Sequence, residues 1–304
     1  MLIEETMNTA SLLSVSTMLG TYPKTQPLKD GTLASSLVRL DFADVDTAQK
    51  AFKDVVRHEK YDVAELAIVT FLQAFEAGKP YVMLPFVMNG GFHHKSLVVR
   101  DGATFTAREL AGRRVAMRAY TQTTPTWVRG ILTDDYGVQL ADVQWLSQEE
   151  AHVADYAEPA WVSRLASTAS LEAMLRAGEV DAIIAGGGLS GEPGIRALIP
   201  TPAEAAAAWH ARTHAVPINH VVTVKRSLAE SRPDAVREIY RLLCEARERA
   251  LAGKPPGGVD LQPKGFAELA PALELAIRYA FEQRLITRRY TLEELYGPVL
   301  DILA

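Results

Sequence analysis

Two periodicities of hydrophobic residues divide the chain into predicted strands and helices. Short apolar runs, alternating with polar residues or continuous, predict strands. Such runs occur at residues 12–16, 37–42, 81–87, 96–99, 113–118, 143–146, 180–185 and 220–224. Because helical segments lie between many of these strands, we expect a mainly parallel sheet with helices on both of its faces.

Segments whose apolar residues recur every three or four positions predict helices. They occur at residues 46–60, 61–78, 107–112, 125–136, 171–177, 203–213, 233–252, 266–283 and 292–303. Asp46 suits the N-cap of the first of these helices, and Pro125 suits the first position of the fourth. The last three helices follow one another directly and predict a helical tail at the C-terminus.

The order of these elements predicts a two-lobed α/β protein. Residues 104–203 contain three of the predicted strands with helices between them. We therefore expect a discontinuous first lobe, residues 1–103 and 204–304, and a continuous second lobe, residues 104–203. In such a topology a small ligand binds in the crevice between the lobes, close to strand ends and helix N-termini.

Composition and charge narrow the class of protein. The 304 residues are 48% hydrophobic and 23% charged, which is ordinary for a globular protein. Acidic residues outnumber basic ones by 37 to 32 and no basic stripe is present, so we expect no nucleic-acid partner. A single cysteine, Cys244, excludes an intrachain disulfide and a cysteine-based zinc site. Its helical setting indicates a small buried hydrophobic residue rather than a nucleophile.

The N-terminal residues bear on the location of the protein. Residues 1–9 contain Glu4 and Glu5 but no basic residue, and the first lysine is Lys24. A secretory signal needs a positive segment before its apolar one, and a membrane span needs about 18 apolar residues. We therefore expect a cytoplasmic protein without a membrane partner. The sequence leaves open whether the chain forms a homo-oligomer.

Four blocks, in order, resemble one known family, the 4,5-dihydroxyphthalate decarboxylases. Residues 22–31, Y-P-K-T-Q-P-L-K-D-G, resemble the family's Y-x-R-T-x-x-L-x-D-G, and residues 61–66, Y-D-V-A-E-L, resemble F-D-V-S-E-L. Residues 119–132, A-Y-T-Q-T-T-P-T-W-V-R-G-I-L, are similar to Y-x-M-T-A-x-x-W-x-R-G-I-L. Residues 217–222, P-I-N-H-V-V, are similar to F-P-I-M-H-x-V. Together the blocks span most of the chain.

This resemblance implies both a fold and a reaction. The family is similar in fold to the type II periplasmic solute-binding proteins, which supports two lobes. Its reaction is the loss of CO2 from a hydroxylated aromatic dicarboxylate such as 4,5-dihydroxyphthalate, and in principle it needs no organic cofactor. The implied partner is a small aromatic carboxylate. The alternative is a non-catalytic solute-binding protein that uses the same cleft for a small aromatic or carboxylate ligand.

One stretch departs from the family pattern. Residues 85–94, P-F-V-M-N-G-G-F-H-H, match a family stretch P-x-F-x-x-R-x-F-R-H, so that Gly90 and His93 stand where the family has arginines. Arginine binds carboxylates through two parallel hydrogen bonds. Its replacement indicates a monocarboxylate or a differently substituted ring as the alternative substrate.

Two histidines and one glutamate are the candidate catalytic residues. His94 and His220 lie at strand boundaries where the lobes would meet, and histidine exchanges protons near neutral pH. The alternative for each is a structural hydrogen bond. Glu65 lies in the second block, and we expect its carboxylate to point into the cleft and orient a histidine or accept a phenol proton. The alternative is an acid placed in the first helical turn by the helix dipole.

The candidate substrate anchors are polar residues before the fourth predicted helix. Free N–H groups at a helix N-terminus bind anions, and the side chains there are Thr121, Gln122, Thr123 and Thr124. The alternative is N-capping by a threonine. Arg129, further along that helix, binds a substrate carboxylate or pairs with Asp134 or Asp135. His93 is a solvated residue or takes the place of an arginine as anion partner.

No residue pattern in the chain indicates a metal site. His93 and His94 are adjacent, and His210 and His214 are four residues apart but lack a third ligand. Residues 186–188 are three glycines without the G-x-G-x-x-G pattern of a nucleotide loop. They indicate a strand end that a ligand can approach closely.

Overall fold

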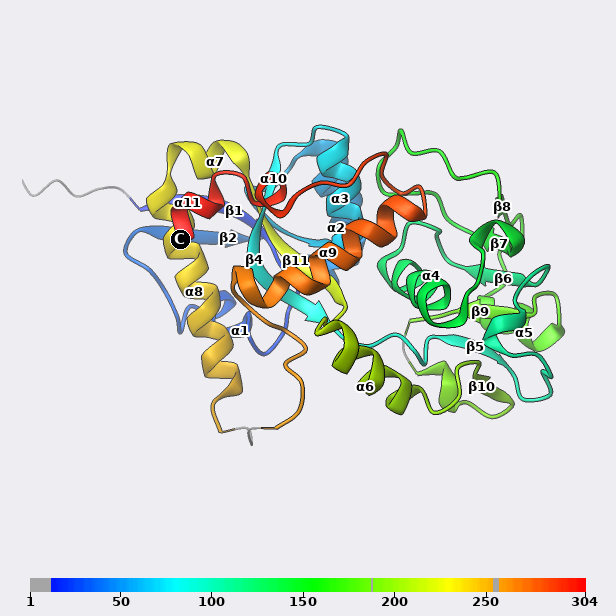
Figure 1. The fold of residues 1–304 in the computed structure, drawn as a ribbon. Coiled ribbons are helices and arrows are strands. Elements are labelled where there is room, and N and C mark those ends of the chain that lie inside the picture. Colours follow the sequence, from blue (N-terminus) through cyan, green and yellow to red (C-terminus); the bar gives the residue numbers. More distant parts are fainter. Residues whose placement is uncertain (1–11, 187, 254–256) are drawn as a thin grey trace, which may run out of the picture.

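Two β-sheets, one in each lobe, organise the chain (Figure 1). The computed structural model describes residues 12–186, 188–253 and 257–304. The predicted α/β class with two lobes and a helical C-terminal tail is confirmed. The prediction of a cytoplasmic location rests on residues 1–9, which lie outside the described residues, as does Gly187 of the predicted strand end at residues 186–188.

The first sheet is mixed and joins the N-terminal part of the chain to residues near 220. Its strand order is β2-β1-β3-β11-β4. Strand β1 runs parallel to β2 and β3, whereas β11 runs antiparallel to β3 and β4. The strands are β1 (Leu13–Met18), β2 (Val38–Phe42), β3 (Val63–Ala67), β4 (Tyr81–Gly90) and β11 (Ile218–Lys225).

The second sheet has the order β10-β5-β9-β6-β7-β8. Its centre is parallel, and β5 and β10 add antiparallel pairs at one edge. Because β5 precedes residue 104, this sheet begins earlier in the chain than the predicted second lobe; the lobe limits themselves stay a prediction. The strands are β5 (Leu97–Arg100), β6 (Arg114–Met117), β7 (Gln144–Ser147), β8 (Val162–Arg164), β9 (Ala182–Ile184) and β10 (Ile195–Ala197).

Helices cover both faces of the first sheet. One face packs against α8 and α11, and the other packs against α2, α3 and α9. The helices are α1 (Gln26–Lys29), α2 (Ala48–His58), α3 (Ile68–Glu76), α4 (Thr123–Tyr136), α5 (Leu171–Ala177), α6 (Pro202–Thr213), α7 (Arg226–Ser231), α8 (Pro233–Leu251), α9 (Phe266–Glu282), α10 (Leu292–Tyr296) and α11 (Val299–Leu303).

Several predicted element boundaries are wrong. The predicted final helix is two helices, because Gly297 adopts a φ of 51° and Pro298 follows it. Thr47, not Asp46, is the N-cap of α2. Helix α4 begins at Thr123, so Pro125 is its third residue rather than its first. The predicted helix at residues 107–112 is a single 3-10 turn.

The largest correction concerns residues 61–67, which were predicted to begin a helix. Strand β3 occupies Val63–Ala67, and α3 begins only at Ile68. All five residues of β3 are buried because the strand lies between β1 and β11. A strand buried on both faces has no alternating pattern, so its sequence resembles that of a buried helix. Glu65 is therefore a strand residue, and the helix-dipole explanation for it is wrong.

One apolar core continues across the boundary between the two sheets. In α4, the Trp127 indole Nε1 donates a hydrogen bond to the Ile218 carbonyl oxygen of β11 at 2.9 Å. Gly130 allows the Tyr279 ring of α9 to lie directly on α4, where a Cβ would collide with that ring. The lobes are thus held by direct packing as well as by the chain that connects them. Within the described residues, no helix is long and apolar enough to cross a membrane.

Candidate functional site

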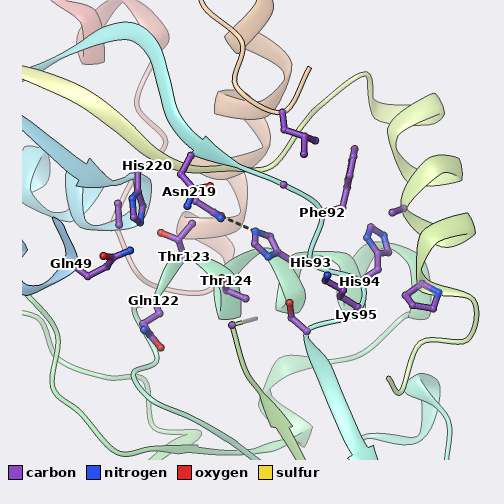
Figure 2. A pocket seen from close by; sticks show the side chains of 18 of the residues that line it. Gln49, Phe92, His93, His94, Lys95, Gln122, Thr123, Thr124, Asn219 and His220 are labelled. Carbon is purple, nitrogen blue, oxygen red and sulfur yellow. Dashed lines mark hydrogen bonds between the residues drawn. The ribbon is translucent and has the colours of Figure 1, made fainter. Parts of the chain in front are cut away.

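A cavity of about 1110 Å³ is lined by residues from both sheets and their connecting loops (Figure 2). Five histidines lie on its wall: His93, His94, His152, His210 and His220. The predicted site residues on the same wall are His93, His94, His220, Gln122, Thr123 and Thr124. The structure thus brings together both candidate histidines and the start of α4.

His220 and Glu65 form a buried pair at the cavity wall. Strands β3 and β11 are antiparallel neighbours in which His220 pairs with Ala67 and Val222 with Glu65, so the two side chains share one face of the sheet. The His220 Nδ1 lies 2.6 Å from the Glu65 Oε1. Because an ionised carboxylate only accepts hydrogen bonds, Nδ1 carries the proton and Nε2 is left to face other partners.

Three donors hold the Glu65 carboxylate. Besides His220, the backbone N–H of Gly20 donates to Oε2 at 2.8 Å and the Tyr22 hydroxyl donates to Oε1 at 2.7 Å. Burial alone would raise the pKa of Glu65, but these hydrogen bonds and the His220 charge outweigh it and lower the pKa below its ordinary value. The Glu65 carboxylate is therefore a fixed anion behind the His220 ring.

Gly20 and Tyr22 are positioning residues that the sequence analysis did not single out. A Cβ at Gly20 would lie 2.6 Å from the Tyr22 ring, so only glycine lets that ring reach Glu65. Tyr22 opens the first of the four matched blocks, and its position there was the one available signal.

His94 has unsatisfied nitrogen atoms. Its side chain is buried, with 2% exposed, and neither ring nitrogen has a hydrogen-bond partner among the described residues. The ring lies edge-on to Trp209 with their centroids 6.1 Å apart. Burial, with a smaller effect of the Arg212 charge, lowers the pKa of His94 to about 4. His94 is thus neutral at pH 7, and its one donor and one acceptor nitrogen are both buried without a partner among the described residues.

His93 is neither solvated nor charged. Its Nε2 donates to the Asn219 Oδ1 at 2.7 Å, as Figure 2 shows, and the residue is buried. Burial lowers its pKa to about 4, against the opposing effect of the Asn219 hydrogen bond. The predicted solvated alternative is wrong, and as an anion partner His93 lacks the positive charge of an arginine.

The N-terminus of α4 faces the cavity. Gln122 is the N-cap, and no side chain caps this end, so the predicted capping role of a threonine is wrong. Thr123 and Thr124 line the cavity, whereas Thr121 is buried and is not part of the wall. The backbone N–H groups of the first turn are therefore available to an anion.

Arg118 lies on the cavity wall beside this helix end and was missed by the sequence analysis. It follows β6 directly, and its only ion pair among the described residues is with Glu149 at 3.5 Å, where both side chains are about half exposed. The Arg118 Nε and Nη2 also donate to the Gln122 side-chain oxygen, at 2.9 and 2.6 Å, in the amide orientation that satisfies both groups. Because exposed ion pairs are weak, the guanidinium is held mainly by Gln122, beside the N-terminus of α4. Its place immediately before the third matched block was the signal for it.

Arg129 does not reach the cavity, and both predictions for it are wrong. It is fully buried and donates to the Gln283 Oε1 and the Tyr120 carbonyl oxygen, each at 2.7 Å. Its guanidinium lies over the Tyr120 ring, 3.8 Å from the centroid. Asp134 and Asp135 pair with other arginines. Arg129 therefore belongs to the core between α4 and α9.

Two further histidines of the wall are held by the protein. The His152 Nδ1 is hydrogen-bonded to the Thr70 hydroxyl at 2.8 Å, and the His210 Nδ1 donates to the Ala215 carbonyl oxygen at 2.8 Å. Gly186 lines the cavity, and the close approach of a ligand to it stays a prediction. No cluster of three or more metal-ligating side chains is found in residues 12–186, 188–253 and 257–304.

Comparison with known proteins agrees with the four matched blocks. No family model matches the chain. A 4,5-dihydroxyphthalate decarboxylase of Comamonas testosteroni is 28% identical over 332 aligned positions, covering 95% of this chain and 97% of that protein. Another of the same name, from Pseudomonas putida, is 29% identical over 215 positions, covering 65% and 81%. The chain is a relative of the 4,5-dihydroxyphthalate decarboxylases.

Solved structures share the fold of this decarboxylase relative. The alkanesulfonate-binding protein SsuA from Xanthomonas axonopodis pv. citri superposes with a TM-score of 0.57 at 15% identity, covering 94% of this chain and 96% of that one. A mutant of DSZB in complex with biphenyl-2-sulfinic acid superposes with a TM-score of 0.58 at 15% identity, covering 96% and 99%. DSZB is described as a desulfurization enzyme. The fold therefore occurs both in a binding protein and in an enzyme.

We expect the buried, neutral His94 to make the folded protein less stable as the pH falls. Its pKa is about 4 in the folded protein and 6.5 for an ordinary histidine, so between these values the unfolded chain binds a proton that the folded chain does not. Folding stability is therefore lost as pH falls below 6.5, by about 2 kcal/mol between pH 7 and pH 5 for this residue. The measurement is the free energy of denaturant unfolding at pH 7 and pH 5. Between these pH values the His94→Gln protein should lose about 2 kcal/mol less stability than the wild-type protein.

The matched control is His58→Gln, because His58 is solvent-exposed on α2. This variant should keep the pH dependence of the wild-type protein. Equal pH dependence of the His94→Gln and wild-type proteins would show that His94 already takes up a proton in the folded state.

Proposed function

We propose that this chain is a carboxy-lyase that releases CO2 from a hydroxylated aromatic carboxylate such as 4,5-dihydroxyphthalate in the cavity between the lobes. The observation that carries the proposal is the pair of Glu65 and His220. A fully buried, ionised carboxylate holds a histidine ring whose second nitrogen is left for the cavity. A ring held in this way is suited to deliver a proton to one fixed point.

Proton delivery to the ring provides the electron sink that decarboxylation needs. Protonated His220 donates the proton on Nε2 to the ring carbon that bears the departing carboxylate, and the ring supplies the electron pair of the new C–H bond. The C–C bond to the carboxylate then breaks and its electrons return to the ring, which restores aromaticity as CO2 leaves. The Glu65 carboxylate stabilises the imidazolium before transfer.

A ring hydroxyl supplies the electron density for the first step. When this hydroxyl loses its proton, electron density moves onto the carbon that is protonated. His94 is the base we assign to the hydroxyl, because it is neutral at pH 7 and its nitrogens have no other partner among the described residues. The two histidines thus act as the acid and base, as the resemblance implied.

The remaining anionic group of the substrate binds at the start of α4. Arg118 supplies a charge, and Thr123 and Thr124 supply hydroxyl and backbone donors. Arginine and a helix N-terminus both favour carboxylates. No step of this scheme requires a redox change, since only protons and one C–C bond are involved.

The rival function is a binding protein without turnover. Its support is that SsuA, with the same fold, is an alkanesulfonate-binding protein. Such a protein would use the α4 anchor but would not need the buried pair of Glu65 and His220. The two functions therefore differ in whether bound ligand loses CO2.

We expect the purified protein to release CO2 from 4,5-dihydroxyphthalate or a hydroxybenzoate. The measurement combines calorimetric binding with an assay of labelled CO2 from carboxyl-labelled ligand, for each compound of a small panel. Turnover of any ligand supports the enzyme. A ligand that binds at saturation without any CO2 release would leave the binding protein as the function.

A further inference from the structure

The cavity has two chemically different halves. The polar half is formed near α2, α3 and the start of α4. The other half, called the apolar half below, is formed by the loop after β4, one face of α6 and residues 257–263; apolar side chains are the majority there, but His93, His94, Lys95, Ser96 and His210 also line it. Figure 2 shows Phe92 on the opposite side of the cavity from Gln49 and Gln122. The apolar half is lined by Phe92, Pro202, Ala203, Ala206, Ala207, Val259 and Leu261.

Gly90 brings Leu261 into the apolar half. A Cβ at Gly90 would collide with the Leu261 carbonyl oxygen and would lie 3.0 Å from the Pro217 carbonyl oxygen. No side chain fits between these two backbones. Residue 90 therefore contributes no cation to the cavity, and the neighbouring His93 is neutral.

The segment that carries Val259 and Leu261 is held by buried polar contacts to Lys24 and β4. The Lys24 ammonium donates to the Gln262 Oε1 and to the Val87 carbonyl oxygen, each at 2.8 Å. Val87 in turn donates its N–H to the Pro263 carbonyl oxygen at 3.1 Å. The two apolar side chains are therefore presented to the cavity from a held backbone.

The side chains of Val259 and Leu261 are unusually exposed for large hydrophobic residues. Val259 is 43% and Leu261 is 41% exposed, which makes them two of the five most exposed large hydrophobic residues in the described parts of the chain. Apolar surface on a cavity wall is covered by a ligand at a gain in free energy. Lys95, the cation in the loop after β4, also lines the cavity and is solvent-exposed.

We propose that the apolar half binds an alkyl or aryl substituent on a hydroxylated aromatic carboxylate, so that the substrate class is larger than 4,5-dihydroxyphthalate. This inference rests on the proposed function for the aromatic carboxylate itself. The cavity volume of about 1110 Å³ is at the upper limit of the roughly 300–1,000 Å³ typical of pockets for drug-sized ligands. A single ring with two carboxylates would leave the apolar half filled with water.

The test measures affinity and not only turnover. Calorimetric Kd values are compared for 3,4-dihydroxybenzoate, 4,5-dihydroxyphthalate and derivatives of each that carry a propyl group at every free ring carbon in turn. At least one propyl derivative should bind about 10-fold or more tightly than its parent, because each methylene in an apolar pocket changes affinity by about 10-fold or more.

The variants Val259→Ser and Leu261→Ser should remove this gain and leave the Kd of the parent compounds within about twofold. Both residues are exposed, so neither substitution should lower the melting temperature appreciably. The matched control is Leu251→Ser at the end of α8, which is 44% exposed and lies outside the cavity wall. The Leu251→Ser protein should still bind the propyl derivative more tightly than its parent, by the same factor as the wild-type protein.

Two results would overturn the proposal: no propyl derivative binds more tightly than its parent, or the gain survives both serine substitutions. CO2 release is measured separately on every compound that binds. A propyl gain that depends on Leu261 without any CO2 release would refute the decarboxylase and leave the apolar half established. Absence of binding by every compound would refute both.

Discussion

Replacing His220 by glutamine should lower the rate of CO2 release by about 10²- to 10⁴-fold, the usual contribution of a positioned acid or base. Glutamine can still donate a hydrogen bond to Glu65 but cannot deliver a proton to the ring carbon. Since the Glu65 pairing can be kept, the fold and the ligand Kd should change little. The measurement is kcat and KM for the best substrate, together with the melting temperature.

The matched control is His58→Gln on the exposed side of α2, which should leave kcat unchanged. Tyr22→Phe serves as a graded comparison, because it removes one of three hydrogen bonds to Glu65 and leaves the other two. It should shift the pH profile of kcat by changing how strongly Glu65 holds the imidazolium. A His220→Gln protein with kcat within threefold of wild type would show that His220 is not the proton donor.

Replacing Arg129 by methionine should destabilise the protein by about 3 kcal/mol, with loss of activity only as far as the fold is lost. The change leaves the Gln283 Oε1 and the Tyr120 carbonyl oxygen without their donor in the core between α4 and α9. Removing one member of a buried charged network commonly costs about 3–5 kcal/mol. Denaturant unfolding at pH 7 is the measurement.

Arg129→Lys should not restore stability, because an ammonium group cannot reproduce the planar set of donors that reaches both oxygens. The control Arg39→Met removes an exposed arginine whose only ion pair among the described residues is with Asp41, and it should cost less than about 0.5 kcal/mol. If Arg129→Met were as stable as wild type and only weakened ligand binding, Arg129 would be a substrate anchor after all.

The residues of the site differ in how well the sequence predicted them. His94 and His220 were predicted because each lies at the boundary of a predicted strand, and both lie on the cavity wall. Glu65 was singled out as well, but in a helix rather than in β3. Arg118 was missed because it lies just outside the third matched block, and its place beside that block was the one signal for it.

Local patterns along the chain were enough to predict the two-lobed α/β class and most strands and helices. Periodicity depends on neighbouring residues alone, and each element follows from its own stretch of chain. These local patterns failed at β3, where burial on both faces removes the alternation that identifies a strand.

The environment of each polar side chain depends instead on residues distant in sequence. Arg129 bonds with Gln283, 154 positions away, and Glu65 with His220, 155 positions away. Whether such a group is charged and reaches the cavity depends on the partners and the burial that folding brings to it. Arg129 and Glu65 are both buried charged residues in matched blocks, yet only Glu65 bonds to a residue on the cavity wall.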